Sequence, residues 1–115
     1  MSVMDEVTID FVGLEKKDKN LILSIFDHLN WGKESDDVHL LMLQNKINDY
    51  LRFIESGEIN EHFSPKDYDK IIIRIIAKYS FGFDCIEFLN NAKQVINDAG
   101  FELEWEVSPI EDDND

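Results

Sequence analysis

The stretch Phe101-Glu-Leu-Glu-Trp-Glu-Val107 alternates apolar and acidic residues at every position. A period of two is typical of a β-strand buried on one face, because successive side chains point to opposite sides. We expect the apolar set to enter a core and the acidic set to form a row on the other face of a sheet. The apolar set is Phe101, Leu103, Trp105 and Val107, and the acidic row is Glu102, Glu104 and Glu106.

The segments before this strand predict the element order ββαβαβ. A polar turn at 16–20 separates two β-rich segments and indicates a hairpin, and the stretch 58–68, which contains Pro65, reads as an irregular connection. Ser35 or Asp36 can cap the first helix and Gly57 can close it. Asp84 with Glu87 resembles a capping box for the second helix, which Gly100 ends. The predicted strands are 7–11, 21–26, 70–79 and 101–107, and the predicted helices are 36–56 and 84–99.

Both predicted helices are apolar on one side only, which favours an α+β fold of two layers. The economical arrangement is a four-stranded mixed sheet with both helices on one face and the other face open. Simple crossovers make the last three strands parallel, although the long connection at 58–68 could reverse the third strand. The apolar stripe of the first helix consists of Leu40, Leu43, Ile47, Leu51 and Ile54.

Composition limits both the organisation and the partners of the chain. Its 115 residues predict a single α+β domain over 5–109 and an acidic, mobile tail over 110–115. The net charge of -14 disfavours nucleic acid and anionic lipid and favours a basic protein partner. The single cysteine, Cys85, cannot form an internal disulfide, and no targeting or membrane segment is visible. These features fit a cytoplasmic protein.

Two surfaces are candidate interfaces. On the first helix, Met42 and Phe53 project opposite the apolar stripe, so we expect both to be partly exposed. They either contact a partner or are covered by the N-terminal arm or by the 58–68 loop. The open sheet face either binds a partner, with a homodimer the first possibility to test, or is an ordinary exposed face. Its apolar residues are Ile22, Phe26, Ile72 and Ile76, beside Arg74 and the Glu102, Glu104 and Glu106 row.

A candidate ligand pocket lies at one end of the predicted sheet. If the second and third strands are parallel, the loops 27–32 and 79–84 meet there, where open α/β sheets bind ligands. Asp27 could orient His28 as a general base inside an aromatic-walled pocket. Alternatively, the loop aromatics plug the end of the core. The pocket residues are Asp27, His28, Trp31, Tyr79, Phe81 and Phe83.

No residue set has the pattern of a catalytic or metal site. The three histidines, His28, His39 and His62, lack a recognised ligand spacing, so we predict no metal and no cofactor. Cys85 belongs to the apolar stripe of the second helix and is expected to be a buried, unreactive thiol, although a helix N-terminus can also activate a cysteine.

The sequence also resembles a family of short, uncharacterised bacterial proteins, a domain of unknown function. The likeness runs from about Val7 to Val107 and is carried by Asp27-His-Leu29, Trp31, His39-Leu40, Leu43-Gln44, Lys46-Ile47-Asn48, Tyr50-Leu51 and Phe53-Ile-Glu-Ser-Gly57. The resemblance implies a small stand-alone bacterial domain and brings no activity with it.

Two functions remain open at this point. The charge favours a non-enzymatic interaction module that binds a basic partner, as small immunity-type or antitoxin-type inhibitors do. The alternative is a small-ligand-binding protein or minor enzyme that uses the loop end around Asp27, His28 and Trp31. An open pocket there, lined by His28, would favour the alternative, and a filled loop cluster would favour the interaction module.

Overall fold

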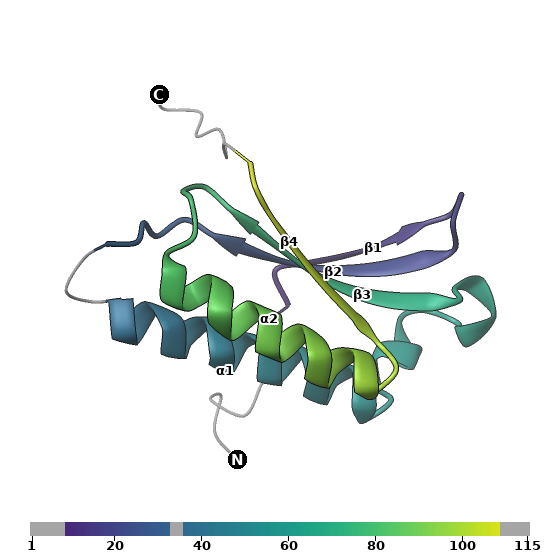
Figure 1. Cartoon of the computed structure of the whole chain (residues 1–115). Helices are drawn as coiled ribbons and strands as arrows, with labels where there is room; N and C mark the ends of the chain where they lie inside the picture. Colours follow the sequence, from purple (N-terminus) through teal and green to yellow (C-terminus); the bar gives the residue numbers. More distant parts are fainter. Residues whose placement is uncertain (1–8, 33–35, 109–115) are drawn as a thin grey trace, which may run out of the picture.

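The computed structural model describes residues 9–32 and 36–108 and has the predicted element order (Figure 1). The stretch predicted as an irregular connection carries two short 3-10 helices, η2 (Glu58–Glu61) and η3 (Pro65–Asp67). The strands are β1 (Phe11–Glu15), β2 (Asn20–Asp27), β3 (Lys70–Ala77) and β4 (Glu102–Val107), and the helices are α1 (Asp36–Glu55) and α2 (Phe83–Asp98).

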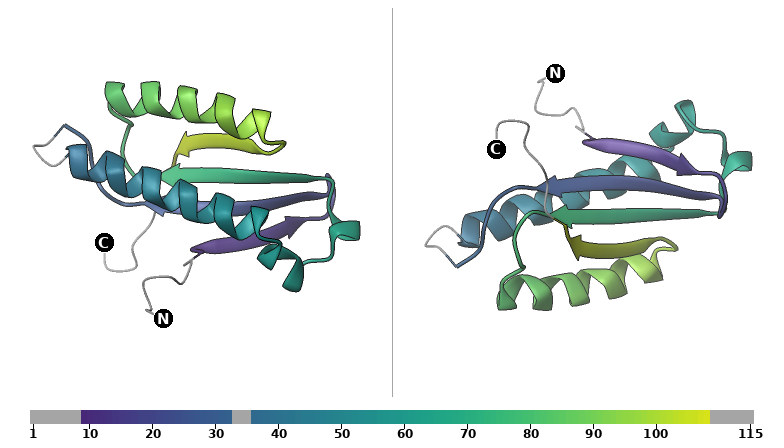
Figure 2. Two further views of the ribbon diagram at one scale, coloured as in Figure 1. Left: turned by 90° about the horizontal axis from the view of Figure 1, so that it is seen from below. Right: turned by 90° about the horizontal axis from the view of Figure 1, so that it is seen from above.

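The four strands form one mixed sheet in the order β1-β2-β3-β4. β1 is antiparallel to β2, whereas β2, β3 and β4 are mutually parallel, so the long connection before β3 does not reverse it. Both helices lie on the same face of the sheet, and the opposite face is not covered by a helix (Figure 2). No helix among the described residues is long and apolar enough to cross a membrane.

The strand registers explain which residues enter the core. Leu23 pairs with Ile73 and Ile73 with Leu103, and all three are buried beneath the helices. Trp105 lies on the same face of β4, packs against the core and has the Lys93 ammonium 5.7 Å from its ring centroid. The predicted faces of β4 are therefore correct, although Val107, at the end of the strand, is about half exposed.

Glycines end both helices as the sequence predicts, but the start of α2 differs. Gly57 and Gly100 have φ angles of 87° and 97°, which glycine adopts without steric cost. At the start of α2 the N-cap is Gly82, and no side chain caps the helix. The expected capping box at Asp84 is therefore wrong, because Asp84 already lies inside the first turn.

The first strand also begins later than predicted. The alternation at 7–11 suggested a strand there, but β1 starts at Phe11 and pairs Glu15 with Asn20 across the short turn. A hairpin turn joins strands that immediately flank it, so the residues next to the turn form the ladder. Residues 7 and 8 lie outside the described part of the chain.

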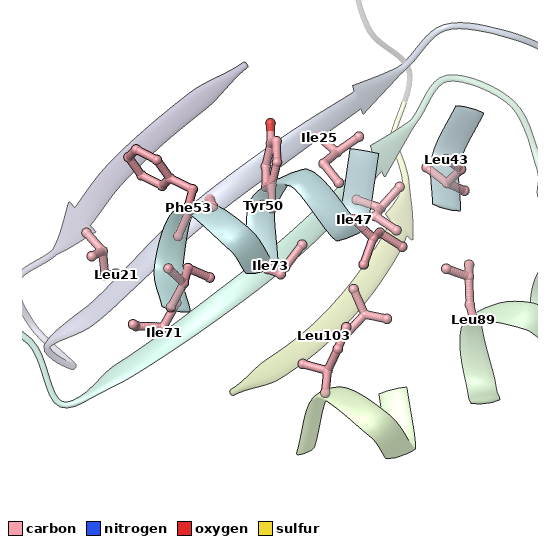
Figure 3. Packing of buried hydrophobic residues seen from close by; sticks show 14 of the residues in the cluster. Leu21, Ile25, Leu43, Ile47, Tyr50, Phe53, Ile71, Ile73, Leu89 and Leu103 are labelled. Atoms are coloured by element: carbon pink, nitrogen blue, oxygen red, sulfur yellow. The ribbon is translucent and has the colours of Figure 1, made fainter. Parts of the chain in front are cut away.

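The sheet-facing side of α1 is rotated relative to the predicted stripe. Leu43, Ile47 and Ile54 are buried as expected, but the buried face also includes two polar residues, His39 and Tyr50. Figure 3 shows Tyr50 among the residues of the core. Phe53 is buried in the core, and His62 stacks on its ring with a centroid distance of 6.2 Å, in agreement with the alternative that the 58–68 stretch covers this residue. The expectation that Phe53 is partly exposed is therefore wrong, whereas Met42 is exposed.

Candidate functional site

Asp27, the last residue of β2, forms a buried pair with His39 in the first turn of α1. The His39 Nε2 atom lies 2.7 and 2.9 Å from the two carboxylate oxygens of Asp27, and Asp27 also accepts a 3.1 Å hydrogen bond from the Leu29 amide. Only 7% of Asp27 and 5% of His39 are exposed. A buried carboxylate requires such a partner. The pair therefore joins the end of β2 to the start of α1.

Trp31 packs over this pair and connects it to the loop that precedes α2. Its ring stacks on that of His39 at a centroid distance of 3.6 Å and an interplanar angle of 14°. A Cβ at Gly82 would lie 3.4 Å from the Trp31 Cβ, so the chain before α2 packs closely against Trp31. The His39 Nδ1 and Trp31 Nε1 atoms are buried without a hydrogen-bond partner. Both nitrogens are thus enclosed in packed rings rather than presented to solvent.

The predicted relation between Asp27 and His28 is replaced by one between Asp27 and His39. Neighbouring residues at a strand end point in opposite directions, so His28 is exposed while Asp27 is buried. The sequence indicated His39 as a histidine to consider for a metal site and as part of the family resemblance, but not as the partner of Asp27. The position of His39 offered a signal, since it is four residues before Leu43 and eight before Ile47 and so shares their side of the helix.

An open cleft of about 380 Å³ lies between α1 and the second half of β2. Three apolar side chains along it are substantially exposed: Phe26 (40%), Leu29 (47%) and Met42 (53%). His28 also lines this cleft. The remaining lining residues are Asp10, Ile25, Asp27, His39, Leu43 and Lys46.

Asp10, Lys46 and Tyr50 form a polar cluster beside the cleft. The Lys46 ammonium lies 2.8 Å from the Asp10 carboxylate. The Tyr50 hydroxyl donates to the Ser24 carbonyl at 2.7 Å and accepts from the Asp10 amide at 2.8 Å. Burial raises the pKa of the Tyr50 hydroxyl, which therefore stays protonated and able to donate.

The three aromatic residues predicted at 79–84 do not line the cleft. Phe81 packs against the core, while Tyr79 is exposed beside the Lys78 ammonium. Phe83 is 83% exposed and lines a separate pocket of about 220 Å³ together with Trp31. Of the six predicted pocket residues, Asp27 and His28 thus line one cavity, Trp31 and Phe83 line another, and Tyr79 and Phe81 line neither.

The histidines and the cysteine do not form a metal or thiol site in the described part of the chain. Among the described residues, no group of three histidine, cysteine or acidic side chains could hold a metal ion. Cys85 is fully buried. Burial, with a contribution from the charge of Asp27, raises the pKa of its thiol to about 12, so the reactive thiolate is not formed near neutral pH.

The predicted apolar residues lie on the open sheet face, but fewer of them are exposed to solvent than the sequence suggests. Ile22 and Ile72 lie on this face but are buried between their neighbours, and Ile76 is partly buried. Arg74 forms an ion pair with Glu104, and the Lys70 ammonium lies 3.4 Å from the Glu102 carboxylate, while Glu106 is exposed. The substantially exposed apolar residues of this face are Phe11 and Phe26, and Phe26 also lines the cleft.

Residues 1–109 match the family described as a family of unknown function, DUF6572. No curated protein and no solved structure matches the chain. The family match spans nearly the whole sequence, including every element of the sheet, both helices and the Asp27–His39 pair. The chain therefore belongs to DUF6572, a family whose function is unknown.

Proposed function

We propose that this protein is a non-enzymatic interaction module that binds a basic protein partner through the cleft between α1 and β2. The supporting observation is the exposure of Leu29 and Met42 along the cleft, with the exposed Phe26 at its rim on the open sheet face. Interfaces are commonly built from a few apolar anchors within a polar surround. The net charge of -14 then favours a partner of opposite sign.

The chemistry of the buried residues supports a role without catalysis. His39 directs one ring nitrogen to Asp27, and its other nitrogen is buried and unpartnered. A general base needs a nitrogen within reach of the substrate, which this histidine lacks. The raised pKa of Cys85 likewise argues against a nucleophilic thiolate.

The test compares two exposed apolar residues that lie on different helices. Met42→Lys places a charge at the cleft, and Val95→Lys makes the same charge change at an exposed position of α2. The immobilised full chain is used to capture a partner from a lysate of the source organism at low and high salt. Dissociation of the identified partner is then timed for each variant.

We expect Met42→Lys to speed dissociation at least tenfold, while Val95→Lys changes it little, because apolar anchors act mainly on dissociation. High salt should slow association with the parent chain. Capture of no specific protein at either salt, or an equal effect of the two substitutions, would contradict this function.

Binding of a small ligand in the same cleft is a second proposal. It is favoured by the cleft volume of about 380 Å³ and by His28 in its lining. Ligand pockets have volumes of roughly 300 to 1,000 Å³. A metabolite library screened by thermal shift tests the proposal. A stabilising compound should lose its effect with Met42→Lys and retain it with Val95→Lys, and the absence of any such compound would count against ligand binding.

A further inference from the structure

The edge of β2 that faces β1 is longer than β1 itself. β1 pairs with residues Asn20 to Ser24, whereas β3 pairs with the whole of β2 as far as Asp27. Among the described residues, Ile25, Phe26 and Asp27 therefore have a neighbouring strand on one side only. Figure 2 shows that β2 extends past the start of β1. An uncovered strand edge offers main-chain groups to which another chain can pair.

Side chains occupy this edge in place of a strand. The Asp10 carboxylate accepts a 3.1 Å hydrogen bond from the Phe26 amide, and the Tyr50 hydroxyl donates to the Ser24 carbonyl. An incoming strand would use the Phe26 amide for its own ladder. The Asp10 carboxylate is partly exposed and has Lys46 as an alternative partner, so it can release the Phe26 amide without losing its ion pair.

The surroundings of the edge suit an extended segment with alternating side chains. On one side lies the cleft, with Met42 on α1 and Leu29 after β2. On the other side, Phe11 and Phe26 lie on the open sheet face. Successive side chains of an added strand would point to these two sides in turn.

We infer that an extended segment of the basic partner adds to the sheet as a strand beside Ile25, Phe26 and Asp27. The inference rests on the proposed function and specifies how the partner binds. The main chain of the segment accepts from the Phe26 amide in place of Asp10. One apolar side chain enters the cleft beside Met42, and flanking lysine or arginine residues complement the net charge of -14. Main-chain hydrogen bonds supply affinity and the cleft supplies selectivity, as in other strand-addition complexes.

The probe for this mode is the capped synthetic peptide Lys-Leu-Lys-Val-Lys-Leu-Lys, added to the full-length isotopically labelled chain. In a strand, alternate residues direct their main-chain groups to opposite edges, so only one of the two sets can face β2. Two further peptides carry N-methyl groups, one at the apolar positions and one at the inner lysines. An acidic peptide with glutamate in place of lysine serves as the charge control.

We expect saturable binding of the parent peptide, with amide shifts concentrated at Ile25 to Leu29 and at Met42. The peptide that is N-methylated on the set facing β2 should bind at least about tenfold more weakly than the other. Each lost hydrogen bond weakens binding by up to about tenfold. The acidic peptide should not bind. On the protein side, Phe26→Pro removes the amide donor and Phe26→Ala retains it, so the proline variant should bind the parent peptide about tenfold more weakly than the alanine variant.

Several results would overturn strand addition. These are equal binding of the two N-methylated peptides, shifts spread over the acidic surface, or no saturable binding at millimolar peptide. A chain that dimerises by itself and loses the dimer with Phe26→Pro would assign the edge to a second copy instead. If strand addition fails while Met42→Lys still releases the captured partner, the interaction module stands and only its binding mode is wrong.

Discussion

The two helices cover the same face of the sheet but are held to it by different interactions. The buried residues of α2 are Cys85, Leu89 and Ile96, none of which forms a side-chain hydrogen bond in the described structure. The buried face of α1 contains His39 and Tyr50 among its apolar residues, and each is bonded to β2. Apolar packing tolerates small rotations of a helix, whereas two directional bonds select one rotation. The polar pairs thus set the orientation of α1, and with it the walls of the cleft.

The largest loss of stability is expected from removing the histidine of the buried pair on α1. His39→Leu leaves the Asp27 carboxylate buried without its partner and should lower the free energy of unfolding by about 3 to 5 kcal/mol. Adding Asp27→Asn should recover part of the loss, because the amide carries no charge. Urea denaturation measures both, with exposed His28→Leu as the control. A His39→Leu variant as stable as the parent would mean that the buried pair does not hold α1 to the sheet.

The corresponding test for α2 is a substitution that creates a cavity beneath this helix. Leu89 is fully buried, and Leu89→Ala should cost about 2 to 5 kcal/mol through lost burial and an unfilled space. Leu41, which is about half exposed on α1, provides the control, and Leu41→Ala should change stability by no more than about 0.5 kcal/mol. Equal effects in the same denaturation experiment would mean that α2 does not pack as described.

Removing one hydroxyl isolates the hydrogen bonds of α1 from its apolar packing. Tyr50→Phe keeps the ring but leaves the Ser24 carbonyl and the Asp10 amide without this partner, at a cost of about 1 to 3 kcal/mol. The cleft should also change shape, which chemical shifts of Met42 and Leu29 would report. Tyr79→Phe, at an exposed ring, should have little effect on stability. An unchanged Tyr50→Phe variant would show that these bonds do not fix α1.

The smallest effect at neutral pH is expected at Cys85, where Cys85→Ala should cost about 1 kcal/mol. The pKa of this thiol is raised from 9.0 to about 12 in the folded state, so above pH 9 only the unfolded chain releases the proton. The stabilisation is therefore complete below pH 9 and is lost as the pH rises towards 12. Denaturation midpoints from pH 8 to 11 should fall less steeply in Cys85→Ala than in the parent, and parallel curves would contradict the assignment.

Elements defined by local periodicity could be predicted from the sequence. The alternation of β4 gave the correct faces, since Leu103 is buried and Glu104 points to the open side, where it meets Arg74. Gly57 and Gly100 marked the helix ends correctly. The start of α2 was less predictable, because a favourable side chain at Asp84 does not decide where the chain enters the helix.

The candidate site depended on contacts between distant residues, which no local pattern encodes. Asp27 and His39 are on different elements, and the sequence instead suggested the adjacent His28. The helix period alone did not show that Phe53 is buried, because His62, which stacks on its ring, lies in the connection after the helix. Among the described residues, β1 pairs with only part of β2, which leaves the strand edge at Ile25 to Asp27 without a second neighbouring strand, and the predicted strand at 7–11 did not indicate this.

Gly13 on β1 has a consequence for solubility. A Cβ at this position would lie 3.0 Å from the ring of Phe11, so the ring occupies space that only glycine leaves empty. Gly13 also pairs with Ile22, which is buried although no helix covers its face. A larger residue at position 13 would push the exposed Phe11 ring outward and enlarge the apolar surface of the open sheet face, and such surfaces promote aggregation. Gly13 therefore helps to keep the protein soluble at high concentration.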